Sequence, residues 1–401
     1  MPHQVVFYHR ETGIVLSVAK NILIRKRRAI QQYVPDLDYN LVKFYYELPE
    51  IKIIPGTDIV KSPSLNAPPA AVDKRNIPKN FAALIKSRHK LMTHTDDVEI
   101  SFEGGMGDQL LESGAVLEAK KRYPGTDITC TVEKKHIDVV KRIQGMPEIR
   151  EKGPSPQHKK NSTNIDMHTH YISDPRGGSY GKSSLYGASL GIQRVNTKAR
   201  LKFSLNDYEN LYKKLPQWIH TKKTKLFGIQ IRSGSGHGKS WNTEPAERLA
   251  NELIKKYGGC VFLFGAKNDF RSESDRMIRT DGRFTWLDTA TLISILDHLT
   301  CIDSGCMHIA RATKTKYTAL WGGTSPMLIL GEKAQEHDIR LELDCIDREC
   351  YDCPKKTCAC MTGITPEMVM KSISTILPEE KTKWPEKQTS LTSTTSSHPL
   401  P

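Results

Sequence analysis

The first residues that could do chemistry lie in the glycine-rich segment Glu103-Gly-Gly-Met-Gly-Asp, between an apolar stretch and an amphipathic one. Glycines let backbone N–H groups approach a ligand closely, and the free N–H groups where a helix starts favour an anion. The segment matches neither the dinucleotide pattern G-x-G-x-x-G nor a phosphate-binding loop. Its distinctive residue is Asp108, which could accept a proton in a cleft, although by residue type alone an N-cap fits it better. Gly105 and Gly107 would form the loop beside it.

A second segment, Ile229-Gln-Ile-Arg-Ser-Gly-Ser-Gly-His-Gly-Lys, runs from an apolar stretch into small residues. Ser233 and Lys239 are its polar side chains of interest. A lysine on a flexible backbone suits a diphosphate, because the ammonium neutralises charge on the leaving group. A solvated turn has the same composition, so this segment alone does not decide between the two.

A third segment begins at Cys301 and again combines an apolar run, a turn and a helical pattern. Asp303, Ser304 and Gly305 place short side chains and open N–H groups at a helix start, where an anion is favoured. His308 follows in the first turn, where a structural role is the commoner one. Another open turn, Trp321-Gly-Gly-Thr-Ser-Pro, adds Thr324.

Alternating strands and helices must position these turns. The predicted strands span residues 97–102, 127–132, 165–172, 226–231, 260–264, 301–303 and 316–321, and the predicted helices 108–122, 135–143, 243–257, 292–299 and a segment starting at 307. Such alternation indicates parallel sheets with crossover helices. We therefore predict an α/β fold with two doubly wound, Rossmann-like domains, and a site in the cleft between them, beyond the carboxyl ends of the strands.

Composition changes along the chain predict five regions. These are a small basic N-terminal α+β module (1–60), a linker (61–96), an acceptor-side domain (97–220), a donor-binding domain with a cysteine cluster (221–378) and a disordered tail (379–401). Residues 1–250 hold 40 Lys and Arg against 25 Asp and Glu, whereas the remainder is nearly neutral. An anionic partner is therefore expected on the N-terminal half, unless the lysines only keep the surface soluble.

The three segments that contain Asp108, Lys239 and Asp303, in this order along the chain, resemble the family 9 glycosyltransferases, the ADP-heptose:lipopolysaccharide heptosyltransferase group. The resemblance rests on Gly107-Asp-Gln-Leu-Leu, Ala119-Lys-Lys-Arg-Tyr-Pro-Gly, Lys239-Ser-Trp, Asp303-Ser-Gly-Cys-Met-His-Ile-Ala, Gly322-Gly-Thr-Ser-Pro and Gly363-Ile-Thr-Pro-Glu. It covers roughly residues 97–377. Two features depart from the family: about ninety-five residues precede the first motif, and Glu112-Ser-Gly replaces a small-Thr-Pro type sequence.

The resemblance implies a GT-B architecture and an inverting transfer that needs no metal. It assigns the role of general base to Asp108, which reverses the preference for an N-cap. It assigns donor binding to Lys239, Ser233, Asp303, Ser304, Gly305, His308 and Thr324. The donor would be a nucleotide-diphosphate sugar and no further cofactor is implied. Both departures fall on the acceptor side, so the acceptor is less well defined than the donor.

Five of the nine cysteines lie between residues 345 and 360. Cys345, Cys350, Cys353 and Cys358 would supply the four thiolates of a structural zinc site, and the C-x2-C pair has a common ligand spacing. The other cysteines have the spacing C-x4-C, which is less typical of zinc ligands. Reduced, surface or disulfide-forming thiols are therefore the alternative. The odd number and uneven spacing indicate a reducing compartment.

The leading hypothesis is a glycosyltransferase that moves a sugar, with heptose as a candidate, to a hydroxyl of an anionic acceptor such as lipopolysaccharide core. One alternative is transfer to modified nucleic acid, as phages use, because Arg25-Lys-Arg-Arg is strongly basic. Another is a non-catalytic binding module. The sequence has no signal-peptide pattern and no apolar run of membrane-spanning length, so we predict a cytoplasmic protein that can contact the inner face of the cell membrane peripherally.

Overall fold

The computed structural model describes residues 4–8, 15–19, 58–59, 79–153, 163–167, 181–221, 224–232, 237–265, 270–271, 274–332, 334–341, 343, 353 and 357–377. The basic segment Arg25-Lys-Arg-Arg and the predicted tail, residues 379–401, lie outside these ranges. Among the described residues, no helix combines the length and the apolar character that crossing a membrane requires.

A four-stranded parallel sheet forms the first half of the described chain, with strand order β6-β5-β4-β7. Its strands are β4 (Asp97–Ser101), β5 (Asp127–Val132), β6 (Glu148–Glu151) and β7 (Thr163–Asp166). The helices around it are α4 (Lys79–Thr93), α5 (Met106–Arg122), α6 (Lys134–Val140) and α9 (Lys182–Ser189). A separate antiparallel sheet near the N-terminus has the order β2-β1-β3 and consists of β1 (Gln4–Tyr8), β2 (Val15–Ala19) and β3 (Asp58–Ile59).

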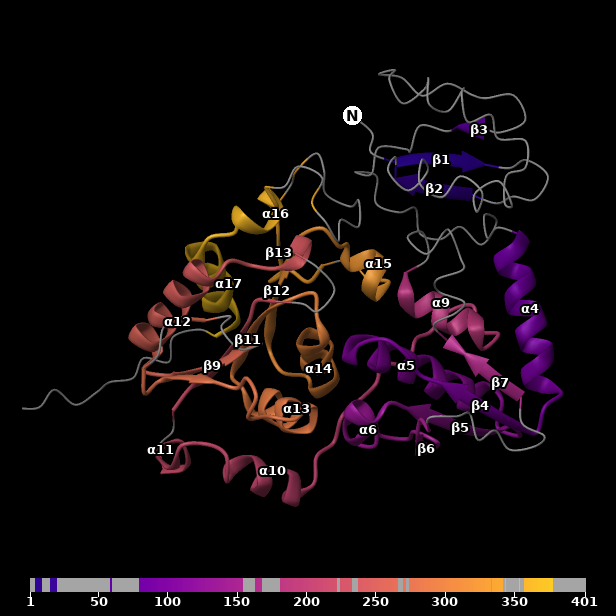
Figure 1. Cartoon of the computed structure of the whole chain (residues 1–401), viewed down its shortest axis with the longest axis horizontal. Coiled ribbons are helices and arrows are strands. Elements are labelled where there is room, and N and C mark those ends of the chain that lie inside the picture. Colours follow the sequence, from indigo (N-terminus) through magenta and orange to yellow (C-terminus); the bar gives the residue numbers. More distant parts are fainter. Residues whose placement is uncertain are drawn as a thin grey trace, which may run out of the picture.

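A six-stranded parallel sheet forms the second half, with strand order β10-β9-β8-β11-β12-β13 (Figure 1). Its strands are β8 (Leu226–Gln230), β9 (Cys260–Phe264), β10 (Met277–Arg279), β11 (His298–Ile302), β12 (Tyr317–Trp321) and β13 (Ile339–Arg340). The helices are α10 (Leu205–Tyr212), α11 (Gln217–Thr221), the 3₁₀ turn η2 (His237–Lys239), α12 (Thr243–Tyr257), α13 (Trp286–Ile295), α14 (Gly305–Thr313), α15 (Pro326–Leu330), α16 (Ala359–Thr362) and α17 (Pro366–Ile376). The α/β class with parallel sheets is thus confirmed.

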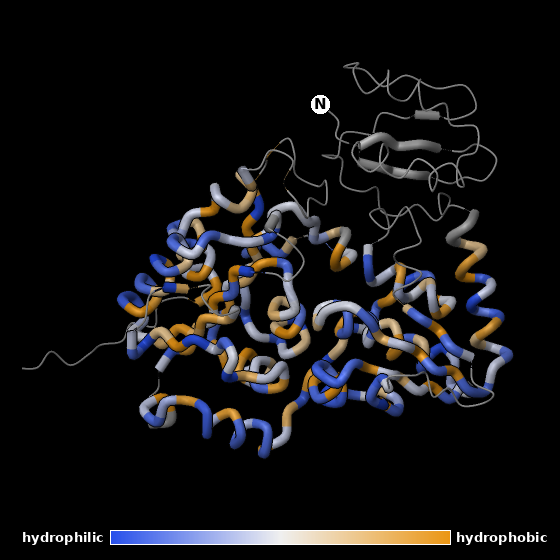
Figure 2. Tube along the Cα trace, viewed as in Figure 1, coloured by the Kyte–Doolittle hydropathy of each residue, from blue (hydrophilic) through white to orange (hydrophobic). Residues whose placement is uncertain are grey.

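Strand alternation explains how this sheet buries two faces. Successive strand residues point to opposite faces, and in β9 Val261 and Leu263 pack with α12 and α17 whereas Cys260 and Phe262 pack with α13 and α14. Every β9 residue is buried, which is why the strand reads as a continuous apolar run. Hydrophobic colouring accordingly concentrates on the strands, whereas polar and apolar residues alternate along α12 (Figure 2).

The two parallel sheets are joined through packed helices rather than by a linker alone. Helix α5 packs on α14, and α6 packs on α13, so the core of the first half continues into one face of the second (Figure 1). These contacts bring the start of α5 to the start of α14, where the candidate site lies.

Several sequence expectations differ from the structure. The helix predicted at 292–299 is instead α13, Trp286–Ile295, because Thr285 and Asp288 form a capping box that starts it earlier. The strand predicted at 301–303 accordingly begins at His298. In addition, the stretch 61–96 predicted as a linker contains α4 in its second half, and α4 packs against α9.

Candidate active site

The turn that precedes α5 presents the first candidate side chain. Gly104 has φ +80°, a left-handed conformation that glycine adopts without strain. Gly105 is the N-cap of α5, and its N–H donates to Asp108 Oδ2 at 3.1 Å. Asp108 is therefore not the N-cap itself but the third helical residue. Its carboxylate folds back over the glycine turn.

Two residues from α9 complete the surroundings of Asp108. Lys182 Nζ and Tyr186 Oη both donate to Asp108 Oδ1, each at 3.0 Å. Burial alone would raise the pKa of Asp108, but the Lys182 ammonium and the hydrogen bonds from Lys182, Gly105 and Tyr186 together hold that pKa below its ordinary value. Asp108 is thus a carboxylate at neutral pH. Sequence reasoning missed both partners because they lie 74 and 78 residues away along the chain, with no local motif.

Replacing Lys182 with Met should raise the pKa of Asp108, because the variant loses the positive charge and the hydrogen bond that favour the ionised form. If Asp108 must be ionised to act, the acidic limb of the rate profile moves to higher pH in this variant. Initial rates between pH 4 and 9 would measure the shift. Lys202→Met removes an exposed lysine elsewhere and should leave the limb in place; an unmoved limb in Lys182→Met would contradict the role of the pair.

The second cluster is a buried ion pair between η2 and the carboxyl end of β11. Lys239 Nζ lies 2.7 Å from Asp303 Oδ2, and the two side chains are only 8% and 5% exposed. Burial would raise the pKa of Asp303, but the charge of the Lys239 ammonium and its hydrogen bond lower that pKa, and a hydrogen bond from Thr324 lowers it to a smaller extent. The pair places the ammonium of Lys239 at the carboxyl end of β11.

Small residues surround the Lys239–Asp303 pair and leave backbone N–H groups at the start of α14 accessible to a ligand. Ser304 is the N-cap residue of α14, and its hydroxyl donates to Gln230 Oε1 at 2.8 Å instead of capping the helix. Gly305 begins the helix, so its N–H group is among those without an intrahelical partner. Thr324 is fully buried after β12. The structure therefore gathers Lys239, Asp303, Ser304, Gly305 and Thr324 at the carboxyl ends of β8, β11 and β12, as the sequence predicted.

His308 lies between the two clusters. It is buried, and its Nε2 is 4.0 Å from Asp303 Oδ1. Burial lowers the pKa of His308 to about 4, against the opposing effect of Asp303. His308 is therefore neutral at pH 7, where it can offer a hydrogen bond but no charge.

The starts of α5 and α14 touch through glycines. A Cβ at Gly107 would lie 2.6 Å from His308 Cδ2, and a Cβ at Gly305 would lie 3.1 Å from Met106 Cβ. Both distances are shorter than side chains ordinarily allow, so the helices can approach this closely only because these positions carry no side chain. This contact brings Asp108 and the Lys239–Asp303 pair to the same place in the fold.

Gly107→Ala tests the close approach. Alanine in a helix is ordinarily more stable than glycine by about 1 kcal/mol, but here its methyl group would press on the buried His308 ring. We expect the free energy of unfolding to fall by about 1–3 kcal/mol, measured by urea denaturation. Gly125→Ala, where nothing lies within 4 Å of the new Cβ, is the matched control; a stabilised Gly107→Ala would show that the helices do not meet as described.

Several predicted residues cannot be placed. Ser233, Cys345 and Cys350 lie outside the described residues. Of the other two predicted zinc ligands, Cys353 accepts a hydrogen bond from the Cys358 N–H at 3.3 Å. No group of three or more His, Cys, Asp or Glu side chains suited to a metal occurs in the part of the chain that the structure describes, so the zinc prediction gains no support.

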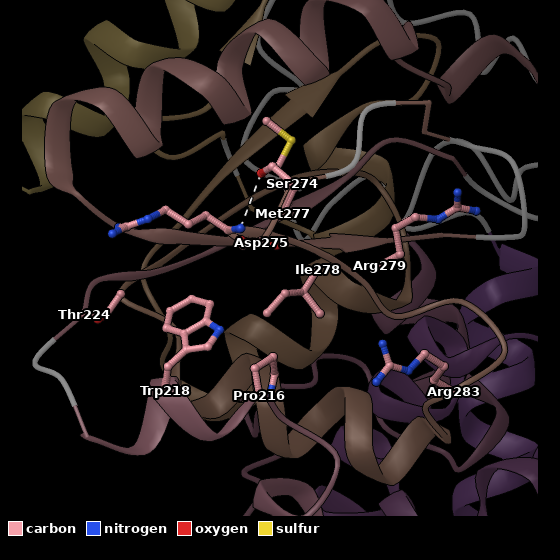
Figure 3. Close-up of a pocket in the computed structure, with 10 residues that line it drawn as sticks. Pro216, Trp218, Thr224, Ser274, Asp275, Met277, Ile278, Arg279 and Arg283 are labelled. Atoms are coloured by element: carbon pink, nitrogen blue, oxygen red, sulfur yellow. Dashed lines mark hydrogen bonds between the residues drawn. The ribbon is translucent and has the colours of Figure 1, made fainter.

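An open groove of about 850 Å³ lies away from both clusters, between α11 and β10. Trp218 of α11 and Ile278 of β10 line it, and Arg279 and Arg283 lie toward one end (Figure 3). Arg279 is engaged with Asp281 at 3.0 Å. The groove shares no lining residue with the Asp108 or Lys239 clusters.

Comparison with solved structures identifies the fold as that of known glycosyltransferases. A family 9 glycosyl transferase from Veillonella parvula has a TM-score of 0.55 at 17% identity, covering 70% of this chain and 97% of that one. The iron-containing dodecameric glycosyltransferase TibC from enterotoxigenic E. coli has the same TM-score and identity, covering 70% and 76%. TibC in complex with ADP-D-beta-D-heptose has a TM-score of 0.53 at 17% identity, covering 70% and 77%.

Part of the chain also matches the sequence model of one glycosyltransferase family. Residues 182–359 match the model of glycosyltransferase family 9 (heptosyltransferase), which confirms the resemblance seen in the motifs. Lys239, Asp303 and His308 lie inside the matched segment, whereas Asp108 lies before it. No curated protein is similar to the chain in sequence.

Proposed function

We propose that this protein is an inverting GT-B glycosyltransferase that transfers a sugar from a nucleotide-diphosphate donor to a hydroxyl of an anionic acceptor such as lipopolysaccharide core. Heptose is the candidate sugar, because TibC, which shares the fold, binds ADP-D-beta-D-heptose. The observation that carries the proposal is the contact between the starts of α5 and α14. It brings the partly buried carboxylate of Asp108 and the buried Lys239–Asp303 pair to the same place in the fold.

In this proposal Asp108 acts as the general base. Its carboxylate takes the proton from the acceptor hydroxyl while that oxygen attacks the anomeric carbon. The bond from the anomeric carbon to the phosphate oxygen breaks, and its electron pair leaves with the nucleoside diphosphate. Attack from the face opposite the leaving group inverts the configuration. Tyr186 and the Gly105 N–H keep the carboxylate oriented toward the acceptor.

Lys239 would stabilise the leaving group. Its ammonium, held in place by Asp303, donates to the diphosphate as negative charge develops there. The N–H groups at the start of α14 and the neutral imidazole of His308 add hydrogen bonds. Every step in this proposal uses side chains and backbone N–H groups of the protein, as in a metal-independent transfer.

A thermal-shift screen with ADP-, UDP-, GDP- and CDP-linked sugars tests the donor side. A ligand that binds only the folded state at 100 times its Kd stabilises by about 2.7 kcal/mol, which corresponds to a rise in Tm of roughly 3 °C for a chain of 401 residues. We expect one nucleotide series to give this shift. If no sugar nucleotide stabilises the protein and nucleic acid does, the binding-module reading replaces the transferase.

One experiment separates the two anionic acceptor candidates, lipopolysaccharide core and modified nucleic acid. Nucleic-acid binding through phosphate contacts weakens steeply with added salt and is equal for unrelated sequences. Such behaviour, together with transfer to hydroxylated bases, would favour a modified nucleic acid over lipopolysaccharide core. The basic residues 25–28 that suggested this alternative lie outside the described residues.

A further inference from the structure

Two buried polar side chains of α5 hold the glycine turn from within the helix. Gln109 Nε2 donates to the Glu103 carbonyl at 2.8 Å, and the Glu103 N–H donates to Glu112 Oε1 at 3.5 Å. Gln109 and Glu112 are both fully buried. Both backbone polar groups of Glu103, its N–H and its carbonyl, are therefore hydrogen-bonded to side chains of α5. Glu103 directly precedes the turn in which the Gly105 N–H donates to Asp108.

Glu112 is in an unusual position for an acid. Its Oε2 is buried and has no hydrogen-bonding partner among the described residues. The charged groups near it are Asp108 on the same helix, Glu103 in the turn and Asp166 on β7, all acidic, and the thiol of Cys130 on β5 is also close. Burial first, and then the charge of Asp108, raise the pKa of Glu112 well above its usual range. An ionised carboxylate there would be unpaired and surrounded by like charges, so the neutral acid is the stable form.

We propose that Glu112 is a positioning residue: as a neutral carboxylic acid it holds, together with Gln109, the Glu103–Gly105 turn that orients the Asp108 carboxylate. This inference rests on the proposed function, in which Asp108 is the general base. It also gives a reason for Glu112 in place of the residue that the resembled family commonly has. A neutral acid can accept the Glu103 N–H without adding a second negative charge one helical turn from Asp108.

The proposal predicts different results for two substitutions. Glu112→Gln keeps a neutral acceptor of the same shape, so kcat should stay within about twofold of the wild type and the acidic limb of the rate profile should not move. Glu112→Met fills the same space but cannot accept the Glu103 N–H. Misplacement of a catalytic group by about 1 Å can cost about a hundredfold, so we expect kcat to fall roughly ten- to a hundredfold with the donor KM unchanged.

Matched variants separate positioning from simple packing. Gln109→Met removes the hydrogen bond to the Glu103 carbonyl and should lower kcat in the same way. This variant keeps the test available if Glu112→Met fails to fold. Ser113→Ala removes a buried hydroxyl that bonds only within the helix, to the Gln109 carbonyl, and should leave kcat unchanged. A wild-type kcat in both Met variants, or an acidic limb that moves to lower pH in Glu112→Gln, would overturn the proposal.

A measurement of stability tests the neutral acid without any activity. A carboxyl that is neutral when folded and ionised when unfolded makes the unfolding equilibrium constant rise about tenfold per pH unit above the unfolded-state pKa. The wild type should therefore lose stability relative to Glu112→Gln as pH rises from 5 to 8, in urea denaturation at each pH. Parallel curves would refute the neutral acid. If the wild type transfers no sugar but the curves diverge, the proposed function fails while the neutral state of Glu112 stands.

Discussion

Asp108→Asn should reduce the rate of sugar transfer by about 10²–10⁴-fold, the contribution typical of a general base. Asparagine has nearly the same shape and can still accept the Gly105 N–H through its amide oxygen, but it cannot take a proton from the acceptor hydroxyl. The stabilisation by the donor nucleotide sugar should persist, because the lysine expected to bind the diphosphate is untouched. Steady-state rates and the thermal shift, measured on the same preparation, check both halves of the prediction.

The matched control for this variant is Asp138→Asn, which changes an exposed aspartate on α6. It should transfer sugar at the wild-type rate. Transfer that survives Asp108→Asn would remove Asp108 from the role of base. Loss of the donor-induced shift in Asp108→Asn would instead mean that the substitution disturbs the contact between α5 and α14.

Lys239→Ala should have the largest effect on stability. It leaves the Asp303 carboxylate buried without its ion-pair partner, and breaking a buried pair in this way costs about 3–5 kcal/mol. The variant should also lose the stabilisation by sugar nucleotides. Urea denaturation with and without the donor measures both effects.

Two further variants separate the fold from the binding role of Lys239. Lys255→Ala removes an exposed lysine on α12 and should change the free energy of unfolding by less than about 0.5 kcal/mol. The double variant Lys239→Met with Asp303→Leu replaces the pair by apolar side chains, which often restores stability. It should recover the fold but not the donor-induced shift; a recovered shift would show that Lys239 does not bind the donor.

The regular elements were predictable where the pattern of apolar residues has a clear period. The predicted boundaries of β5, α12 and β9 agree with the structure, because an apolar run bounded by turns marks a buried strand and a 3.6-residue period marks an amphipathic helix. Prediction failed at α13, where only Asp297 and His298 separate the apolar residues of the helix from those of the next strand. There the capping box at Thr285 and Asp288 was the better signal.

The turns that form the candidate site could be predicted from the sequence, but the ion pairs and hydrogen bonds between their side chains could not. Parallel strands bring their carboxyl ends to one edge, so the sequence could predict that the Lys239 and Asp303 turns meet. Their ion pair, and the bonds from Lys182 and Tyr186 to Asp108, depend on side-chain directions that no periodicity records. The burial of Glu112 was hidden for a related reason, since its polar type suggests the exposed face of α5.

The continuous core described above bears on how this chain unfolds. One apolar cluster contains residues of β4, β5 and α5 together with residues of α13 and α14. Helix α10, on the N-terminal side of the boundary at 220/221 expected from the sequence, packs against α13 on the other side. Cutting the chain there would expose Leu211 and Leu215, both buried in that cluster. The two halves should therefore melt as one cooperative unit, with a single calorimetric transition, and fragments made at that boundary should be prone to aggregate.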